Sequence, residues 1–338
     1  MNGLLAGISR RFVLAGIVGA ALVGATAPAA AQGKVTLSFA VSGADRGPLR
    51  DVSMHIANRM KELTNSRVTV DRFMGGTLGG EVQLGELLAS GEIDIILTGV
   101  FADSFFPEYT IGSIPFLLPT WEDKAKFFDH PTIRQKITEK LKPRGLVYLE
   151  PITMGAQYIT SNRSLIEPAD IKGMKLRVAE DKAQIEIYGG VGALVTPISA
   201  KEIVSALKTG IVDGQVNTLA NNFGRQLWET QKFLIRGNHI VWPWNLATSE
   251  KALAKLTPED RQVLVKVARE ARELAVKSVE QHERPMIETM TKQRGMTLVE
   301  WSPDQLKRWQ VAASPAIAGL LKDRDPLLIE IVKSLGGM

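Results

Sequence analysis

Short apolar runs that favour β-strands alternate along this chain with stretches of helical periodicity. Residues 35–41 are apolar and β-prone. Over residues 49–63, apolar side chains then recur three or four positions apart, as on one face of an amphipathic helix. The alternation continues with a strand at residues 68–73, a helix at 82–88 and a strand at 93–97. This order predicts a parallel sheet with right-handed crossovers.

The middle of the chain repeats this α/β pattern. Residues 174–178 predict a strand, and residues 199–208 predict a helix. Ser199 and Glu202 have the spacing of a capping box at the start of that helix. Residues 211–216 predict the next strand, directly after a glycine that ends the helix.

The pattern Leu-x-x-Gly-x-x-Asp occurs twice, at residues 88–94 and at residues 207–213. In both places a predicted helix ends at the glycine and a strand follows. One explanation is the ordinary chemistry of a loop between a helix and a strand. The other is a pair of α/β lobes of similar design. Such lobes would face each other across a cleft, because ligands of open α/β sheets bind beyond the carboxyl ends of the strands.

The C-terminal part is predicted to be helical. Thr257, followed by a proline, is a strong helix start, and the apolar pattern continues to about Arg294. Pro285 is expected to kink this helix. Ser302 caps a further helix, and Pro326 interrupts the last one. A helix as long as the first of these can span two lobes.

The N-terminus has the three parts of a secretion signal. Arg10 and Arg11 precede an apolar stretch over residues 12–23, and three alanines at 29–31 provide a signal-peptidase site. We expect residues 1–31 to be removed by cleavage after Ala31 and the protein to work in the periplasm. A retained membrane anchor is the alternative. The two arginines fit both an ordinary Sec signal and a twin-arginine signal.

Composition narrows the function further. The 338 residues contain no cysteine, which excludes disulfides, thiolate metal sites, cysteine nucleophiles and lipoprotein attachment. Without the two arginines of the leader, 39 basic residues face 36 acidic residues, a net charge of +3. This weak and dispersed charge does not favour a nucleic-acid partner. The length after the leader is enough for two lobes with separate cores.

Enzyme motifs are missing from the sequence. The four histidines are scattered without metal-ligand spacing: His55, His130, His239 and His282. The glycine-rich run at residues 75–80 lacks both the Gly-Lys-Ser/Thr ending of a phosphate loop and the spacing of a dinucleotide-binding loop. We therefore expect no catalytic residue, no metal site and no cofactor.

Arg177 is the candidate anion-binding residue. It lies near the carboxyl end of the strand at residues 174–178, where a side chain can point into a cleft. Its planar guanidinium can donate two parallel hydrogen bonds to a carboxylate. A structural salt bridge to an acid such as Glu180 is the alternative.

Five stretches of the chain carry a resemblance to a known family. They are residues 160–163, 170–178, 206–217, 238–240 and 256–260, of which 170–178 reads DIKGMKLRV. Together they resemble the solute-binding receptors of tripartite ATP-independent periplasmic (TRAP) transporters, of the dicarboxylate-receptor type. The resemblance extends over essentially the whole chain after the leader.

The resemblance implies an α/β fold of two lobes, with mixed, mainly parallel sheets and a long helix that bridges both lobes. On this basis the first lobe would contain residues 32–154 and 243–282. The second lobe would contain residues 155–242 and 283–338. The chain would cross between the lobes in both directions, and a solute would bind between them.

The resemblance also implies which residues contact the ligand. Arg177 would bind its carboxylate, and Asn217 would add a hydrogen bond. Members that bind sialic acid have a second arginine at the position of Gln157, so a neutral hydrogen bond replaces that cation here. The acid that members often have after the third strand is also missing, since residues 98–100 are Thr, Gly and Val. A single cation suggests a monocarboxylate, or a dicarboxylate held in part by neutral donors.

Aromatic residues complete the candidate site. Trp242 and Trp244 lie where the chain is expected to cross back into the first lobe. They would either stack on an apolar or aromatic part of the ligand or pack as part of the hinge. Phe73, at the end of the second strand, is a candidate for the opposite wall.

The function that follows is that of an extracytoplasmic receptor. It would capture an organic acid, a mono- or dicarboxylate with room for an apolar or aromatic part, and deliver it to the membrane subunits of a TRAP transporter. Two alternatives remain open at this point: an exported enzyme that acts on a small carboxylate, and a binding protein that docks on a sensor kinase.

Overall fold

The computed structural model describes residues 33–101 and 105–337. The predicted signal, with its cleavage site after Ala31, lies outside these residues. The first elements follow in the predicted order: β1 (Val35–Ala40), α1 (Gly47–Leu63), β2 (Val68–Phe73), α2 (Glu81–Ser90) and β3 (Ile95–Thr98).

The described strands join in a mixed ten-stranded sheet, whose main path runs β2-β1-β3-β9-β4-β7-β5-β6. The strands not yet given are β4 (Leu146–Ser161), β5 (Lys175–Val178), β6 (Leu194–Pro197), β7 (Gly214–Thr218), β8 (Phe233–Arg236), β9 (Val241–Ser249) and β10 (Thr297–Glu300). β1 is parallel to β2 and β3, and β5 is parallel to β6 and β7. These two parallel groups form two halves of the sheet, which β4 and β9 connect by antiparallel pairing.

β4 crosses from one half of the sheet to the other at a bulge. It pairs with β9 up to Ala156 and with β7 from Gln157 onward. Just before this change the register shifts, and Gly155 has a φ of 80°, which favours glycine. A Cβ at this position would also lie 3.0 Å from the side chain of Val279 on the long helix α10.

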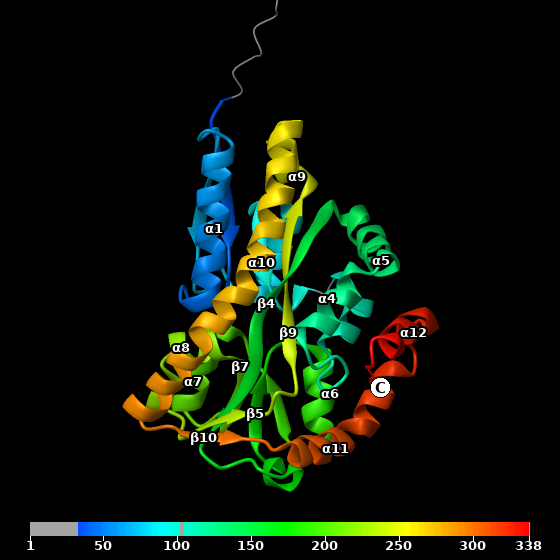
Figure 1. Ribbon diagram of the computed structural model, residues 1–338. Coiled ribbons are helices and arrows are strands. Elements are labelled where there is room, and N and C mark those ends of the chain that lie inside the picture. The colour runs from blue at the N-terminus through cyan, green and yellow to red at the C-terminus, as the bar shows by residue number, and fades with distance from the viewer. Residues whose placement is uncertain (1–32, 102–104, 338) are drawn as a thin grey trace, which may run out of the picture. The chain divides into compact units, whose positions relative to one another are not determined.

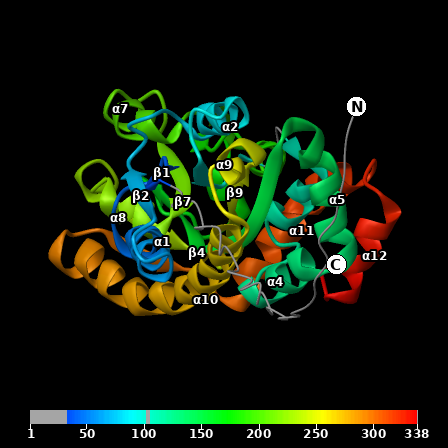
Figure 2. The ribbon, with the colours of Figure 1, turned by 90° about the horizontal axis from the view of Figure 1, so that it is seen from above.

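The long helix α10 (Pro258–Glu288) packs against both halves (Figures 1 and 2). The hydroxyl of Thr257 caps it by accepting a backbone hydrogen bond. Its neighbours are α1 and β4 in one half and α8 (Leu219–Gly224) in the other. The helix continues through Pro285, and its irregular part is a π-helical turn over Thr289–Gln293. The predicted bridging helix is therefore confirmed.

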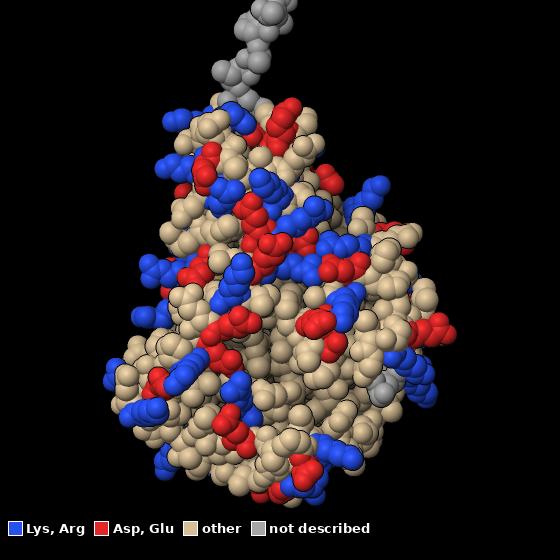
Figure 3. Space-filling model, viewed as in Figure 1, with Lys and Arg blue, Asp and Glu red and all other residues tan. Residues whose placement is uncertain are grey.

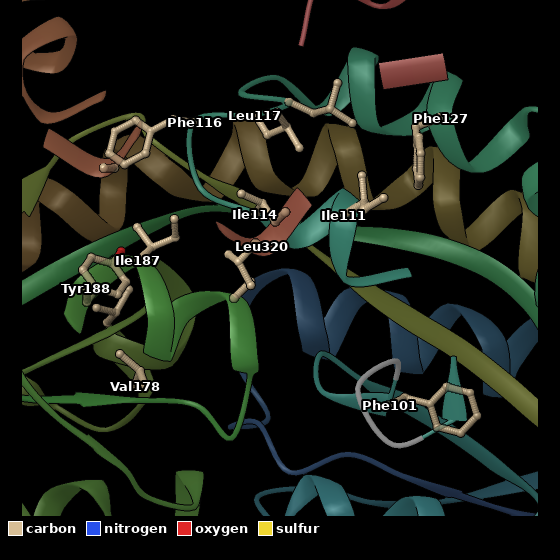
Figure 4. Close-up of a cluster of buried hydrophobic side chains, with 14 of the residues drawn as sticks. Phe101, Ile111, Ile114, Phe116, Leu117, Phe127, Val178, Ile187, Tyr188 and Leu320 are labelled. Carbon is tan, nitrogen blue, oxygen red and sulfur yellow. The ribbon is translucent and has the colours of Figure 1, made fainter. Parts of the chain in front are cut away.

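Apolar side chains cover both faces of the sheet. Leu37 and Phe39 of β1 point to the side of α1 and α10, whereas Ala40 joins a larger cluster on the opposite side. This larger cluster, part of which is drawn in Figure 4, includes Ile187 of α6 and Leu320 of α11. The other described helices are α4 (Trp121–Asp129), α5 (Pro131–Leu141), α6 (Lys182–Gly190), α7 (Ile203–Lys208), α9 (Glu250–Ala254), α11 (Pro303–Leu321) and α12 (Pro326–Ser334).

Charged side chains of both signs are interspersed on the face that α10 crosses (Figure 3). Several of them pair: Arg272 of α10 binds Asp129 and the buried carboxylate of Glu150 at 2.7 and 3.1 Å. Acidic and basic side chains on this face therefore neutralise one another locally, in agreement with the small net charge of the sequence. Within residues 33–101 and 105–337, no helix is both long and apolar enough to span a bilayer.

The predicted helix at residues 199–208 begins differently from its sequence pattern. Ser199 makes no capping hydrogen bond, and a 3-10 turn over Ala200–Glu202 precedes α7. The capping-box prediction is therefore wrong. The hydroxyl of Ser199 instead lies against Gly80 of the other half, where an added Cβ would be 2.6 Å from Ser199 Oγ.

The strand expected at residues 211–216 begins three residues later, as β7. Ile211 is 57% exposed and lies in the preceding turn. The strand starts where it packs closely against β4. A Cβ on Gly214, its first residue, would lie 2.5 Å from the carbonyl oxygen of Thr160.

The segment before β9 buries a histidine. His239 is 1% exposed, and its Nε2 lies 2.6 Å from the hydroxyl of Tyr188 on α6. The rings of Phe116 and Trp301 lie beside the imidazole. Its Nδ1 has no hydrogen-bond partner among the described residues. Burial lowers the pKa of His239 to about 3, so the ring is neutral at pH 7.

We predict that His239 makes the fold sensitive to acid. Its pKa is about 6.5 in the unfolded chain and about 3 in the folded chain, so between these values the unfolded chain binds more protons. Stability is therefore full above about pH 6.5 and falls as the pH drops through this window, by up to about 1.4 kcal/mol per pH unit. Urea denaturation of His239→Gln should show a smaller loss between pH 6.5 and 4.5 than the wild type.

Tyr188→Phe is the matched control, because it removes the partner of His239 and keeps the titrating ring. It should retain the acid dependence of the wild type. Equal acid dependence in the wild type and in His239→Gln would contradict the prediction.

Candidate functional site

Arg177 is a buried cation without a paired acid. Its side chain leaves β5 only 3% exposed, and its Nε and Nη1 donate to the carbonyl oxygens of Ile198 and Val216 at 2.8 and 3.3 Å. Among the described residues it forms no ion pair, and the proposed alternative partner, Glu180, is exposed. Burial lowers the pKa of Arg177 to about 9, so it keeps its charge at pH 7.

Glu81 brings a carboxylate to the end of β3. It is the first residue of α2 and is 8% exposed. Its Oε2 accepts hydrogen bonds from the Thr98 hydroxyl and from the backbone N–H groups of Gly99 and Val100, at 2.8 to 2.9 Å. Its Oε1 accepts a bond from the hydroxyl of Ser42 at 3.1 Å. Residues 98–100, at the end of β3, contain no acidic residue. Glu81 therefore supplies a carboxylate at this position from α2.

Arg225 is a second cation, partly buried, which the sequence did not indicate. It follows α8, and its Nε donates to the carbonyl oxygen of Ala200 at 3.2 Å. Its Nη1 donates to Asn221 Oδ1 at 2.9 Å, and its Nη2 reaches the carbonyl oxygen of Ser42 in the other half at 3.4 Å. Burial lowers the pKa of Arg225, against the opposing effect of the negative charge of Glu81.

Three consecutive residues after β6 hold these groups together. The carbonyl of Ile198 binds Arg177, and the carbonyl of Ala200 binds Arg225. Between them, the buried hydroxyl of Ser199 faces the backbone just before Glu81 and has no partner among the described residues. The negative charge of Glu81 acts on both guanidinium groups. The two arginines and the glutamate therefore form one cluster, which we call the charged cluster.

Asn217 and Gln157 lie on neighbouring strands beside this cluster. Asn217 of β7 is 6% exposed, and its Oδ1 accepts hydrogen bonds from the backbone of Thr218 and from Asn221 Nδ2. Gln157 of β4 is 1% exposed and pairs with Thr218 across the strands. Neither amide atom of the Gln157 side chain has a partner among the described residues. Such a group is favourable only when something else binds it.

The predicted aromatic residues occupy three different places. Trp242 packs with Val100 and Ala179, one from each half, and an added Cβ on Gly99 would lie 2.9 Å from its ring. Trp244 is 1% exposed in the core beneath α1 and α10. Phe73, at the end of β2, is partly buried against the larger cluster. Only Trp242 adjoins backbone groups that bind Glu81.

A family model described as bacterial extracellular solute-binding protein, family 7 (DctP), matches residues 40–323. The chain belongs to this family. A solute-binding protein of Roseobacter denitrificans is 27% identical over 73% of this chain and 76% of its own length. The C4-dicarboxylate-binding periplasmic protein DctP of Vibrio cholerae is 25% identical over 88% of this chain and 90% of its own length.

Solved structures agree with this assignment. A sugar acid-binding protein of Advenella mimigardefordensis in complex with galactonate has a TM-score of 0.84 at 25% identity, over 90% of this chain and 98% of that one. A TRAP periplasmic solute-binding protein of a Polaromonas species, bound to D-erythronate, has a TM-score of 0.82 at 27% identity, over 89% and 98%. One from Bordetella, with density attributed to pantoate, has a TM-score of 0.82 at 26% identity, over 88% and 98%.

These findings confirm the resemblance to TRAP solute receptors and the two-lobed α/β fold predicted from the sequence. Family 7 is a family of extracellular receptors, and the relatives are described as solute-binding proteins. A receptor is therefore supported over an exported enzyme. Within residues 33–101 and 105–337, no group of His, Asp and Glu side chains could hold a metal ion.

We predict that the side-chain amide of Gln157, which makes no hydrogen bond within the described residues, is not needed for folding. Leucine is similar in size, so Gln157→Leu should leave the free energy of unfolding within about 1 kcal/mol of the wild type or raise it. Urea denaturation of the ligand-free protein measures this change.

Gln215→Leu is the matched control. Gln215 is also fully buried, but its Nε2 donates to Thr160 and Asn222 at 3.0 and 2.9 Å. Its replacement should lower the free energy of unfolding by about 1–3 kcal/mol, because both acceptors lose their donor. If Gln157→Leu destabilised the protein as much as Gln215→Leu, the prediction would be wrong.

Proposed function

We propose that this family 7 receptor captures an organic acid by its carboxylate at Arg177 and delivers it to the membrane subunits of a TRAP transporter. The observation that carries the proposal is the buried charge of Arg177, which has only neutral carbonyl partners among the described residues. A buried charge is costly unless it is paired. Of the five N–H groups of the guanidinium, three remain to bind a carboxylate.

The chemistry of the related complexes supports a carboxylate. Galactonate and D-erythronate are bound in two of the structures, and the density in a third is attributed to pantoate. Each of these molecules has one carboxylate and at least two hydroxyl groups. In this chain, Asn217 and Gln157 would hydrogen-bond to the solute. Trp242 would form an apolar wall of the site, whereas Trp244 and Phe73 pack in two other hydrophobic clusters.

We infer that the two halves act as lobes, with residues 32–154 and 243–282 in one and 155–242 and 283–338 in the other. The change of partner along β4 at Ala156 and Gln157 supports this boundary, and so does the bulge at Gly155. Ligand contacts to both lobes would favour the closed state. The exported protein would begin at Gln32, after cleavage behind Ala31, and N-terminal sequencing of the periplasmic protein tests this.

We predict that carboxylates stabilise the protein and that Arg177 is responsible. In a thermal-shift screen, a true ligand at a thousand times its Kd adds roughly 4 kcal/mol of stability. For a carboxylate found in this way, Arg177→Gln should weaken binding by about 30-fold to several thousand-fold in titration calorimetry. This range corresponds to roughly 2–5 kcal/mol for one partner of a buried charged pair.

Arg163→Gln is the control, because it makes the same change at an exposed position whose Nη1 binds only the carbonyl oxygen of Asp170. It should leave the affinity unchanged. A screen in which only sugars or amines stabilised the protein would overturn the carboxylate proposal. Unchanged affinity in Arg177→Gln would remove Arg177 from the site.

A further inference from the structure

The charged cluster has an excess of one positive charge. Arg177 is a buried cation, Arg225 is a partly buried one, and Glu81 is the one buried acid whose charge acts on both. Three more charged residues lie nearby but are exposed to solvent: Glu180, Lys201 and Glu202. Water screens these outer charges much more than the buried ones. A ligand with one negative charge would therefore neutralise the charged cluster.

The hydrogen bonds of Glu81 restrict what can lie beside it. Its Oε2 already accepts three bonds, whereas Oε1 accepts one, from Ser42. A carboxylate oxygen has room for a further donor, so Oε1 can accept a hydroxyl of the solute. A second carboxylate at the same place would meet like charge in a buried site, which is strongly unfavourable.

Arg225 is fixed in this cluster from both sides. Ala200 and Asn221 hold it in one half, and the carbonyl of Ser42 binds it from the other. The hydroxyl of the same Ser42 donates to Glu81. Ser42 thus places the second cation and the acid next to each other. Among the described residues Arg225 has no ion pair, so its charge also remains available to an anion.

We propose that Arg225 and Glu81 set the ligand preference of this receptor to hydroxylated monocarboxylates, with Glu81 as the residue that excludes a second carboxylate. This rests on the proposed function, because Arg177 is taken to hold the first carboxylate. The positive charge of Arg225 increases the attraction of the site for the single carboxylate of the ligand. Glu81 accepts a hydroxyl of the solute at the position where a dicarboxylate would bring its second charge.

Two pairs of molecules test the preference with the smallest chemical change. D-erythronate and meso-tartrate differ only in that a terminal CH₂OH group of the first is a carboxylate in the second. D-galactonate and galactarate differ in the same way. Calorimetry with the wild type should give at least about tenfold tighter binding of the monocarboxylate in whichever pair binds, which corresponds to about 1.4 kcal/mol.

Glu81→Gln is the decisive variant, since it keeps the size and most hydrogen bonds of the side chain and removes its charge. It should reduce the preference for the monocarboxylate to less than about threefold or reverse it. Arg225→Gln changes the charge in the opposite direction. It should weaken binding of the monocarboxylate by about tenfold or more, and binding of the dicarboxylate by a larger factor. Circular-dichroism melting curves establish that both variants are folded.

The outcomes separate this proposal from the proposed function. If carboxylates bind and Arg177→Gln weakens binding as predicted, but Glu81→Gln leaves the preference unchanged, only the roles of Glu81 and Arg225 are wrong. If the wild type binds the dicarboxylates as tightly as the monocarboxylates, or binds neither pair but a different dicarboxylate, the monocarboxylate preference is overturned. If no carboxylate binds at all, the proposed function itself fails.

Discussion

The site depends on a guanidinium that is removed from water without a carboxylate to accompany it. Arg177 is held by backbone carbonyl groups, which satisfy part of its hydrogen bonding but do not cancel its charge. The carbonyl groups of Ile198 and Val216 must therefore lie within hydrogen-bonding distance of the guanidinium. Ile198 follows β6 and Val216 lies in β7, so the two strands beside β5 both contribute to this arrangement. The parallel sheet of this half thus serves as the support for one charge.

The same constraint explains why both halves of the sheet meet at this point. Ser42, in the loop after β1, touches Glu81 through its hydroxyl and Arg225 through its carbonyl. Gly80 leaves just enough space for Ser199 of the opposite half. Small residues at these positions let charged groups from distant parts of the sequence approach each other. The effect of the Glu81 charge on the two arginines of the other half therefore depends on close backbone packing.

Much of the fold could be predicted from the sequence, because strand and helix periodicity are local properties. Arg177 could be found in the same way, since it lies in a recognisable strand. Glu81 and Arg225 could not. An acid in the first turn of a helix is explained by the helix dipole alone, and an arginine after a short helix carries no pattern. Both matter only through contacts across the sheet. The capping-box prediction for Ser199 was wrong for the same reason, because its hydroxyl lies against Gly80 of the other half instead of capping the helix.

The order of strands has a consequence for how the chain is made. β9 lies between β3 and β4, so the first half of the sheet lacks an inner strand until residues 241–249 have been synthesised. The earlier strands then have an unpaired edge and cannot complete their core. Pairings between such distant segments form slowly. We expect the growing polypeptide to remain largely unfolded until late in synthesis, when β9 fills the gap between β3 and β4 and the core of the first half can close.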